Sequence, residues 1–275
     1  MKKIILILTL TLTCFSVMSK RINPNSDFSG EKSRLAFSAA QHETSTQTDS
    51  LIKTLDISID GNKGVVALYG TKTDEIYYTD VYASVKTENS SYNITLADGY
   101  SPDMWYLNFT ENEKFLFFSS QTGGSGGYGN YGVFRLSETS YDTLYTNVSD
   151  SNSQVFSAEF VNGGKMVIKD LKSGGAVTIN VKYMDKNFYN QIFTKKGKVK
   201  GEAPYVNDVS FVAPVLNGAT GVYDLITYRS VAAIAEVNRL GYITQNLSFS
   251  SLPEMENKEN IGRFSPYFTS FSINF

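Results

Sequence analysis

The sequence predicts an all-β protein with antiparallel strands, and three features of its 275 residues support this class. Apolar and polar residues alternate in many short runs, as in Leu55–Ile59. Turn-forming groups such as Gly61-Asn62-Lys63-Gly64 separate these runs. The chain also has 18 tyrosines and 18 phenylalanines against one tryptophan, and such aromatic rings pack well on pleated, half-buried surfaces.

The elements can be placed in order from these alternating runs. Only Val231–Leu240, which reads Val-Ala-Ala-Ile-Ala-Glu-Val-Asn-Arg-Leu, is predicted to be helical. One short helix does not change the fold class. The predicted strands are Leu55–Ile59, Val65–Tyr69, Tyr78–Lys86, Tyr92–Leu96, Trp105–Phe109, Phe115–Ser119, Tyr131–Leu136, Val155–Phe160, Lys165–Lys169, Ala176–Lys182, Val209–Val212, Tyr223–Tyr228, Tyr242–Phe249 and Phe268–Phe275.

Residues 1–19 have the pattern of a signal peptide. Two lysines precede the apolar run Ile4–Leu12, and Val-Met-Ser at 17–19 gives a small-residue cleavage pattern. The run is too short for a membrane-spanning helix, which needs about 20 apolar residues, so no transmembrane segment is expected in the mature protein. Secretion to the extracellular side is therefore expected, with lipid anchoring through Cys14 as the alternative.

The remaining chain divides into a polar segment and a folded part. Residues 20–50 are polar and lack a period, which is typical of a flexible tether. Residues 51–275 form the predicted all-β domain, with a weak internal repeat that gives four units: 51–100, 101–150, 151–206 and 207–275. Units of this size resemble the blades of a β-propeller. Two small β-sandwich domains, divided near residue 150, would give the same spacing.

Two segments carry a family resemblance. One is the strand at 115–119 followed by Thr-Gly-Gly-Ser-Gly-Gly, and the other is Gly221–Arg229 followed by Leu240–Gln245. Both resemble segments of secreted VCBS/FG-GAP-like proteins of Gram-positive bacteria, and the similarity extends loosely over residues 52–250. The resemblance implies an extracellular, integrin-like β-propeller-type fold, a non-catalytic role and calcium held in Asp-rich loops.

The calcium-binding pattern implied by this resemblance is degenerate here. The family's loop has the form D-x-D-G-D-G, whereas residues 215–221 contain no carboxylate and the next one is Asp224. The other loop retains Glu111 and Glu113 but adds Lys114 and has Phe115 where an acid is expected. Because calcium affinity follows the number of anionic ligands, we expect no cofactor, and at most a weak calcium site.

The glycine-rich run at 122–132 is the most unusual local feature. Its backbone amides could approach an anion, but no Lys-Ser/Thr ending and no helix follow, so a long hairpin or a blade crossing is the alternative. An intermediate interpretation is a ligand-facing loop, since tyrosine is enriched in recognition surfaces. The candidate ligand-binding residues are Gly123, Gly124, Gly126, Gly127, Tyr128 and Tyr131.

Several kinds of chemistry are disfavoured by composition. His42 is the only histidine and lies in the predicted tether, and Cys14 lies within the signal peptide, so neither a catalytic triad nor a zinc site is expected. The net charge of −2 provides no basic field for nucleic acid. Paired carboxylates remain formally available, although no spacing singles out a pair. These acids are Asp98, Asp103, Glu159, Asp170, Asp208 and Asp224.

The sequence therefore favours a secreted or cell-surface binding module without enzymatic activity. Its expected partner is a cell-wall or extracellular glycan, or a protein. A structural cell-surface or spore-envelope protein is the alternative, and a carboxylate-based hydrolase is a minor one. The alternating aromatics of Phe268–Phe275 are further predicted to close the fold by pairing near Leu55–Ile59, because closure removes an exposed sheet edge.

Overall fold

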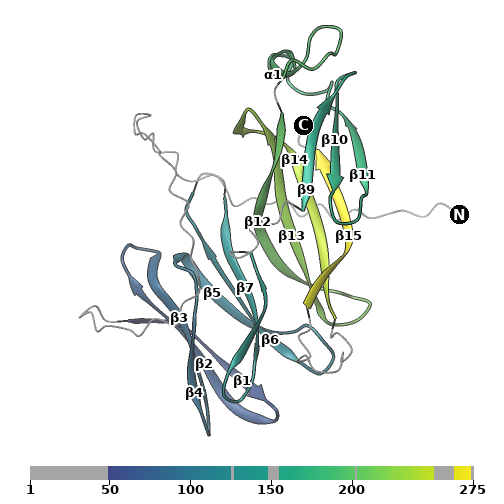
Figure 1. Ribbon diagram of the computed structural model, residues 1–275. Helices are drawn as coiled ribbons and strands as arrows, with labels where there is room; N and C mark the ends of the chain where they lie inside the picture. Colours follow the sequence, from purple (N-terminus) through teal and green to yellow (C-terminus); the bar gives the residue numbers. More distant parts are fainter. Residues whose placement is uncertain (1–48, 125–126, 148–154, 202, 251–262, 274–275) are drawn as a thin grey trace, which may run out of the picture. The chain divides into compact units, whose positions relative to one another are not determined.

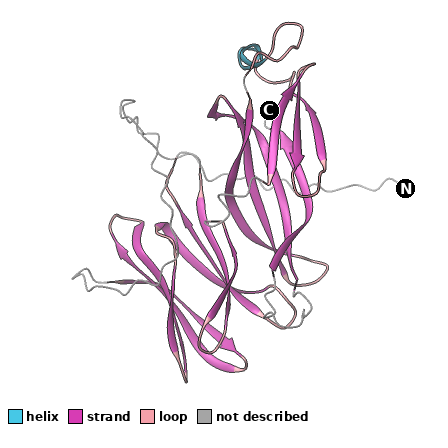
Figure 2. Ribbon diagram, in the orientation of Figure 1, coloured by secondary structure: helices cyan, strands magenta, loops and turns pink. Residues whose placement is uncertain are grey.

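The computed structural model describes residues 49–124, 127–147, 155–201, 203–250 and 263–273. Figure 2 shows this part of the chain as strands, loops and a short helix. The predicted all-β, antiparallel class is confirmed, since every pairing between the described strands is antiparallel. The predicted signal peptide and residues 20–48 of the predicted tether lie outside the described residues.

The first eight strands form one sheet (Figure 1). Its pairing order is β1-β2-β3-β5-β6-β7-β8, and β4 pairs with β3 beside this path. The strands are β1 (Ser50–Ile59), β2 (Asn62–Lys72), β3 (Tyr77–Thr87), β4 (Ser91–Thr95), β5 (Gly99–Asn108), β6 (Lys114–Gln121), β7 (Gly129–Leu136) and β8 (Tyr141–Thr146).

This sheet folds over itself at the junction between β3 and β5. The two strands pair only at Tyr77↔Tyr100 and Tyr78↔Gly99, so β1–β4 and β5–β8 separate into two leaves beyond that point. Apolar side chains of both leaves meet in one buried cluster, where Leu68 of the first leaf and Phe118 of the second are at most 2% exposed. The arrangement within residues 49–147 is therefore sandwich-like, with a core between two leaves of one sheet.

The rest of the described chain forms two smaller sheets and a helix. The three-stranded sheet has the order β11-β10-β9 and the four-stranded sheet has the order β12-β13-β14-β15. Asp185 caps the helix, because its side chain accepts hydrogen bonds from two backbone N–H groups of the first turn. The elements are β9 (Phe156–Val161), β10 (Lys165–Asp170), β11 (Ala176–Asn180), α1 (Lys186–Ile192), β12 (Pro204–Leu216), β13 (Tyr223–Ala233), β14 (Ala235–Ser250) and β15 (Arg263–Ile273).

One face of the four-stranded sheet contributes to two hydrophobic clusters. We call it the inner face, and define it by Leu225, Thr227, Arg229 and Val231, which alternate along β13. Leu225 packs in a cluster with the outer side of the second leaf, including Phe117. Val231, at the other end, packs in a cluster with the three-stranded sheet. The inner face is thus covered at both ends by different sheets.

The sheets fit the sandwich-like alternative of the fold prediction. The strands of residues 51–100 and 101–150 lie in one continuous sheet rather than in two separate blades. Strand spacing alone could not separate these arrangements, because the pairing of β3 with β5 through two residue pairs leaves no mark on the periodicity.

The predicted helix at Val231–Leu240 is wrong. Residues up to Ala233 continue β13, Ile234 has a positive φ of 67°, and β14 begins at Ala235. A short apolar run cannot be assigned by periodicity, and here pairing on both sides of β13 decides for a strand.

The predicted closing strand also pairs elsewhere. The residues of Phe268–Phe275 that are described belong to β15, which pairs with its sequence neighbour β14 and places Phe271 opposite Ile243. The residues near Leu55–Ile59 pair with β2 instead. Strands that follow one another in the chain pair with each other more often than distant ones do, which agrees with both results.

Candidate ligand-binding pocket

The glycine-rich run forms the connection of the β6–β7 hairpin. The backbone N–H of Thr122 donates to the carbonyl of Tyr128 at 2.9 Å, and Gly123 and Gly127 have φ values of 77° and 68°. Such angles suit glycine because it lacks a Cβ atom. A Cβ at Gly129 would lie 2.4 Å from the hydroxyl of Tyr131, so this glycine also makes room for a ring.

The structure separates the six candidate residues of this run. Gly123, Gly124 and Gly127 are exposed, Tyr128 is half-buried, and Gly126 lies outside the described residues. Tyr131 is only 3% exposed and packs against the rings of Phe117 and Phe211. Burial raises the pKa of its hydroxyl. The ring of Tyr131 therefore serves the core, and ligand binding by the exposed glycines stays a prediction.

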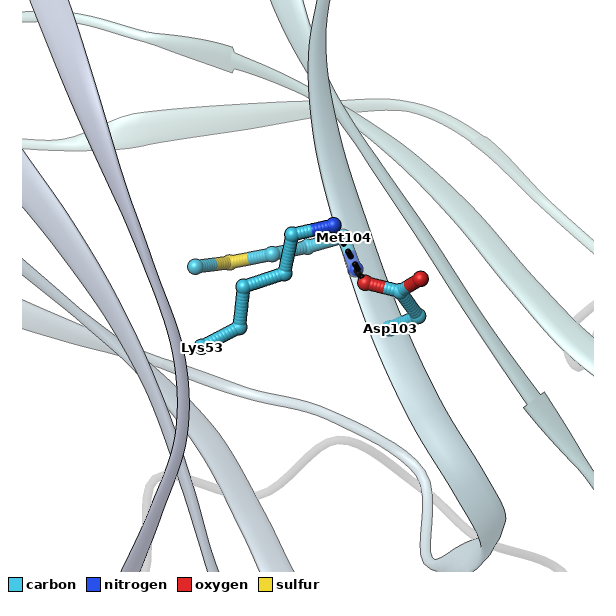
Figure 3. A network of polar contacts seen from close by, with 3 residues as sticks. All are labelled: Lys53, Asp103 and Met104. Atoms are coloured by element: carbon cyan, nitrogen blue, oxygen red, sulfur yellow. Dashed lines mark hydrogen bonds and ion pairs between the residues drawn. The ribbon is translucent and has the colours of Figure 1, made fainter.

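Two of the candidate acids form ion pairs with lysines. Asp103 pairs with Lys53 at 2.6 Å, and Figure 3 shows that it also accepts from the backbone N–H of Met104. The Lys53 ammonium lies 4.8 Å from the centre of the Trp105 ring. Glu159 pairs with Lys169 at 2.7 Å. Such exposed or half-exposed ion pairs contribute about 0–1 kcal/mol each.

The residues of the degenerate calcium loops are also placed. Asn217 donates to Asp224 at 2.9 Å, and its own side-chain oxygen accepts from the backbone of the following turn. Glu113 lies 3.8 Å from Arg135. Within the described residues, no group of three or more His, Cys, Asp or Glu could hold a metal ion.

A pocket of about 400 Å³ lies over the middle of the inner face. Polar side chains interrupt the apolar pattern there: Thr227, Arg229 and Gln245 are 2%, 7% and 7% exposed. These three residues form the polar band. Strand register brings them together, because Thr227 lies two residues before Arg229 on β13 and directly opposite Gln245 on β14.

The walls of the pocket come from several sheets. Strand β8 contributes one wall. One end of the three-stranded sheet contributes Val155, just before β9, and the exposed Lys172, just after β10. The ammonium of Lys172 attracts the neighbouring carboxylate of Asp170, so its charge is partly balanced. The other lining residues are Thr143, Leu144, Tyr145, Thr146, Val209, Leu247, Phe264 and Pro266.

Arg229 is the unusual member of the polar band. Its Nε–H is buried without a hydrogen-bond partner, and no described carboxylate forms an ion pair with its guanidinium. An arginine side chain keeps its charge in proteins, so it cannot relieve burial by losing a proton. Buried unpaired charges are costly. The inner face therefore presents an unsatisfied cation to a cavity large enough for a small ligand.

The sequence did not point to this site, although Arg229 lies in one of the two segments on which the expected family resemblance was based. A signal was present: in Leu225-x-Thr227-x-Arg229-x-Val231, a charged residue occupies the position at which alternation places core side chains. Recognising it requires knowing which face of β13 is covered, and the sequence does not reveal this.

The protein defined by this fold and pocket is an all-β protein whose second half resembles a known domain. Residues 154–257 match the family model of the YybI C-terminal domain. This segment includes β9–β14 and therefore all three residues of the polar band. It does not include Thr143–Thr146 of β8 or Phe264 of β15, which complete the walls.

A relative can be named as well. The chain is 23% identical over 168 residues to the protein named "Uncharacterized protein YybI" from Bacillus subtilis (strain 168), and the match covers 60% of this chain. It spans 64% of the length of that relative. No solved structure matches the chain. Among the described residues, no helix has the length and apolar character needed to cross a membrane.

Proposed function

We propose that this chain is a secreted or cell-surface, non-catalytic binding module that holds a ligand in the pocket over the polar band. The observation that carries the proposal is the pocket itself. Its volume of about 400 Å³ lies in the range of small-molecule sites, and its walls combine apolar side chains with a few buried polar groups. The signal-peptide pattern of residues 1–19 supports the external location.

The absence of histidine and cysteine after residue 42 supports a role without catalysis, since the common nucleophile–base pairs need one of them. The candidate acids support the same role, because Asp103 and Glu159 are paired with lysines. The proposed partner is a glycan or a protein of the cell exterior. A structural surface protein without a ligand is the competing proposal.

A bulky substitution at the pocket wall tests this proposal. Thr143 is exposed on β8 and lines the pocket, so Thr143→Trp should fill the space without disturbing a buried cluster. A screen of extracellular glycans, peptides and small metabolites would first identify ligands that the unmodified protein binds saturably. We expect Thr143→Trp to abolish the binding of these ligands. The measurement is isothermal titration calorimetry on the folded variant.

The matched control is Thr178→Trp. Thr178 is exposed on β11 and does not line the pocket, so the same substitution there leaves the pocket open. This variant should bind as the unmodified protein does. Equal loss of binding in both variants would mean that the pocket is not the site, and absence of any saturable ligand would favour the structural role.

A further inference from the structure

We infer that the pocket recognises the carboxylate of a small organic acid, and that Arg229 is the residue that binds it. This inference rests on the proposed function, since it names the class of ligand for the same pocket. It is carried by a cation that is 7% exposed, has an unsatisfied Nε–H and lines a cavity.

The charge of Arg229 requires an anion. A guanidinium group stays protonated at all physiological pH values, so the buried cation persists whether or not a ligand is present. None of the described residues that line the pocket is an acid. A bound anion would therefore supply the missing counter-charge and the missing hydrogen-bond acceptor at once.

The arrangement of donors fits a carboxylate. A guanidinium can bind one side-on with its Nε–H and a terminal N–H, which forms two parallel hydrogen bonds. Thr227 and Gln245 lie beside Arg229 on the same face and can donate from a hydroxyl and an amide. The Gln245 amide donates to Thr269 at 3.5 Å and has a second N–H for a ligand. One buried cation with two neutral donors matches a single negative charge better than the two charges of a phosphate group.

The remaining walls indicate an organic body on the acid. Leu144, Val209 and Leu247 are buried side chains that line the pocket, and Phe264 adds an aromatic ring. A small inorganic anion would leave these apolar surfaces and most of the 400 Å³ unused. An aliphatic or aromatic tail would remove them from water, which contributes to affinity in proportion to the apolar area buried.

Matched acids and amides test this inference on the protein without the predicted signal peptide. The probes are hexanoate and phenylacetate, their neutral amides hexanamide and phenylacetamide, and inorganic phosphate. We expect each carboxylate to raise the melting temperature and to give saturable heat in calorimetry, because a ligand that binds only the folded state stabilises it. The amides and phosphate should bind at least about tenfold more weakly.

Two variants assign the effect to Arg229. Arg229→Met should weaken carboxylate binding by about 10- to 100-fold, the range expected when hydrogen bonds to a charged group are lost. Arg229→Lys keeps the positive charge but loses the two parallel N–H donors of the guanidinium. Its affinity for the carboxylates should therefore lie between those of the unmodified protein and Arg229→Met. The amides should bind both variants as they bind the unmodified protein.

Each contrary result has a distinct meaning. Equal binding of acids and amides would overturn the carboxylate assignment while leaving a ligand-binding pocket. Binding of phosphate alone would overturn the ligand class, and no response to either carboxylate would overturn the inference outright. A response that survives Thr143→Trp would place binding outside the pocket and contradict the proposed function as well.

Discussion

Replacing Phe117 by alanine is expected to lower the free energy of unfolding by about 3–5 kcal/mol. The ring is 2% exposed and belongs to the cluster in which the second leaf meets the four-stranded sheet. It lies 5.7 Å from the Trp105 ring and 6.4 Å from the Tyr131 ring, measured between centroids. Removing it leaves a cavity whose lining loses its contacts.

Urea denaturation followed by the fluorescence of Trp105, the only tryptophan, measures this loss directly. The control is Phe268→Ala on β15, where the side chain is 53% exposed and the expected change is within about 0.5 kcal/mol. Domains have about 5–15 kcal/mol of stability, so the first variant should unfold at a much lower urea concentration. Similar midpoints for the two variants would contradict the shared core.

Replacing Arg229 by methionine is expected to raise the free energy of unfolding of the ligand-free protein. The variant removes a buried donor without a partner, and leaving such a group unsatisfied costs about 1–3 kcal/mol. Methionine is unbranched and can occupy the apolar surroundings of the side chain. We therefore expect the ligand-free variant to be more stable than the unmodified protein by about this amount, measured by denaturation after extensive dialysis.

Arg239→Met provides the matched control for this gain. The Nε–H of Arg239 is also buried without a partner, but its guanidinium donates to the Tyr242 hydroxyl at 2.6 Å and lies 5.3 Å from the centre of the same ring. Losing these contacts should leave stability unchanged or lower it. If Arg229→Met lowered the stability as much as Arg239→Met does, Arg229 would be a structural residue and not a residue that binds an anionic ligand.

The sequence predicted the positions of most strands of this protein, but it did not predict how the strands pair into sheets. Alternation located most strands, because a half-buried strand must place apolar residues at every second position. It failed at Val231–Ala233, where buried residues follow one another without alternation. It also missed β8 and the seven-residue helix α1, whose clearest mark in the sequence is the capping residue Asp185.

The candidate site could not be predicted, for a related reason. Glycine-rich and tyrosine-containing segments stand out in a sequence, but the structure places Tyr131 in the core. Arg229 stands out only once the face it occupies is known to be buried, and that depends on the pairing of β13 with strands from distant parts of the chain and on the sheets that cover it. Long-range packing of this kind leaves no local pattern.

The most direct test of the pocket observes the Arg229 side chain itself. In a ¹⁵N–¹H spectrum of the protein, the Nε–H signal of Arg229 can be assigned by its disappearance in Arg229→Lys. On titration with hexanoate we predict a saturable downfield shift of this proton, since a carboxylate would accept its hydrogen bond. Hexanamide should leave the signal much less changed. A signal that stays in place while hexanoate binds would contradict the account, because the carboxylate would then be bound without Arg229.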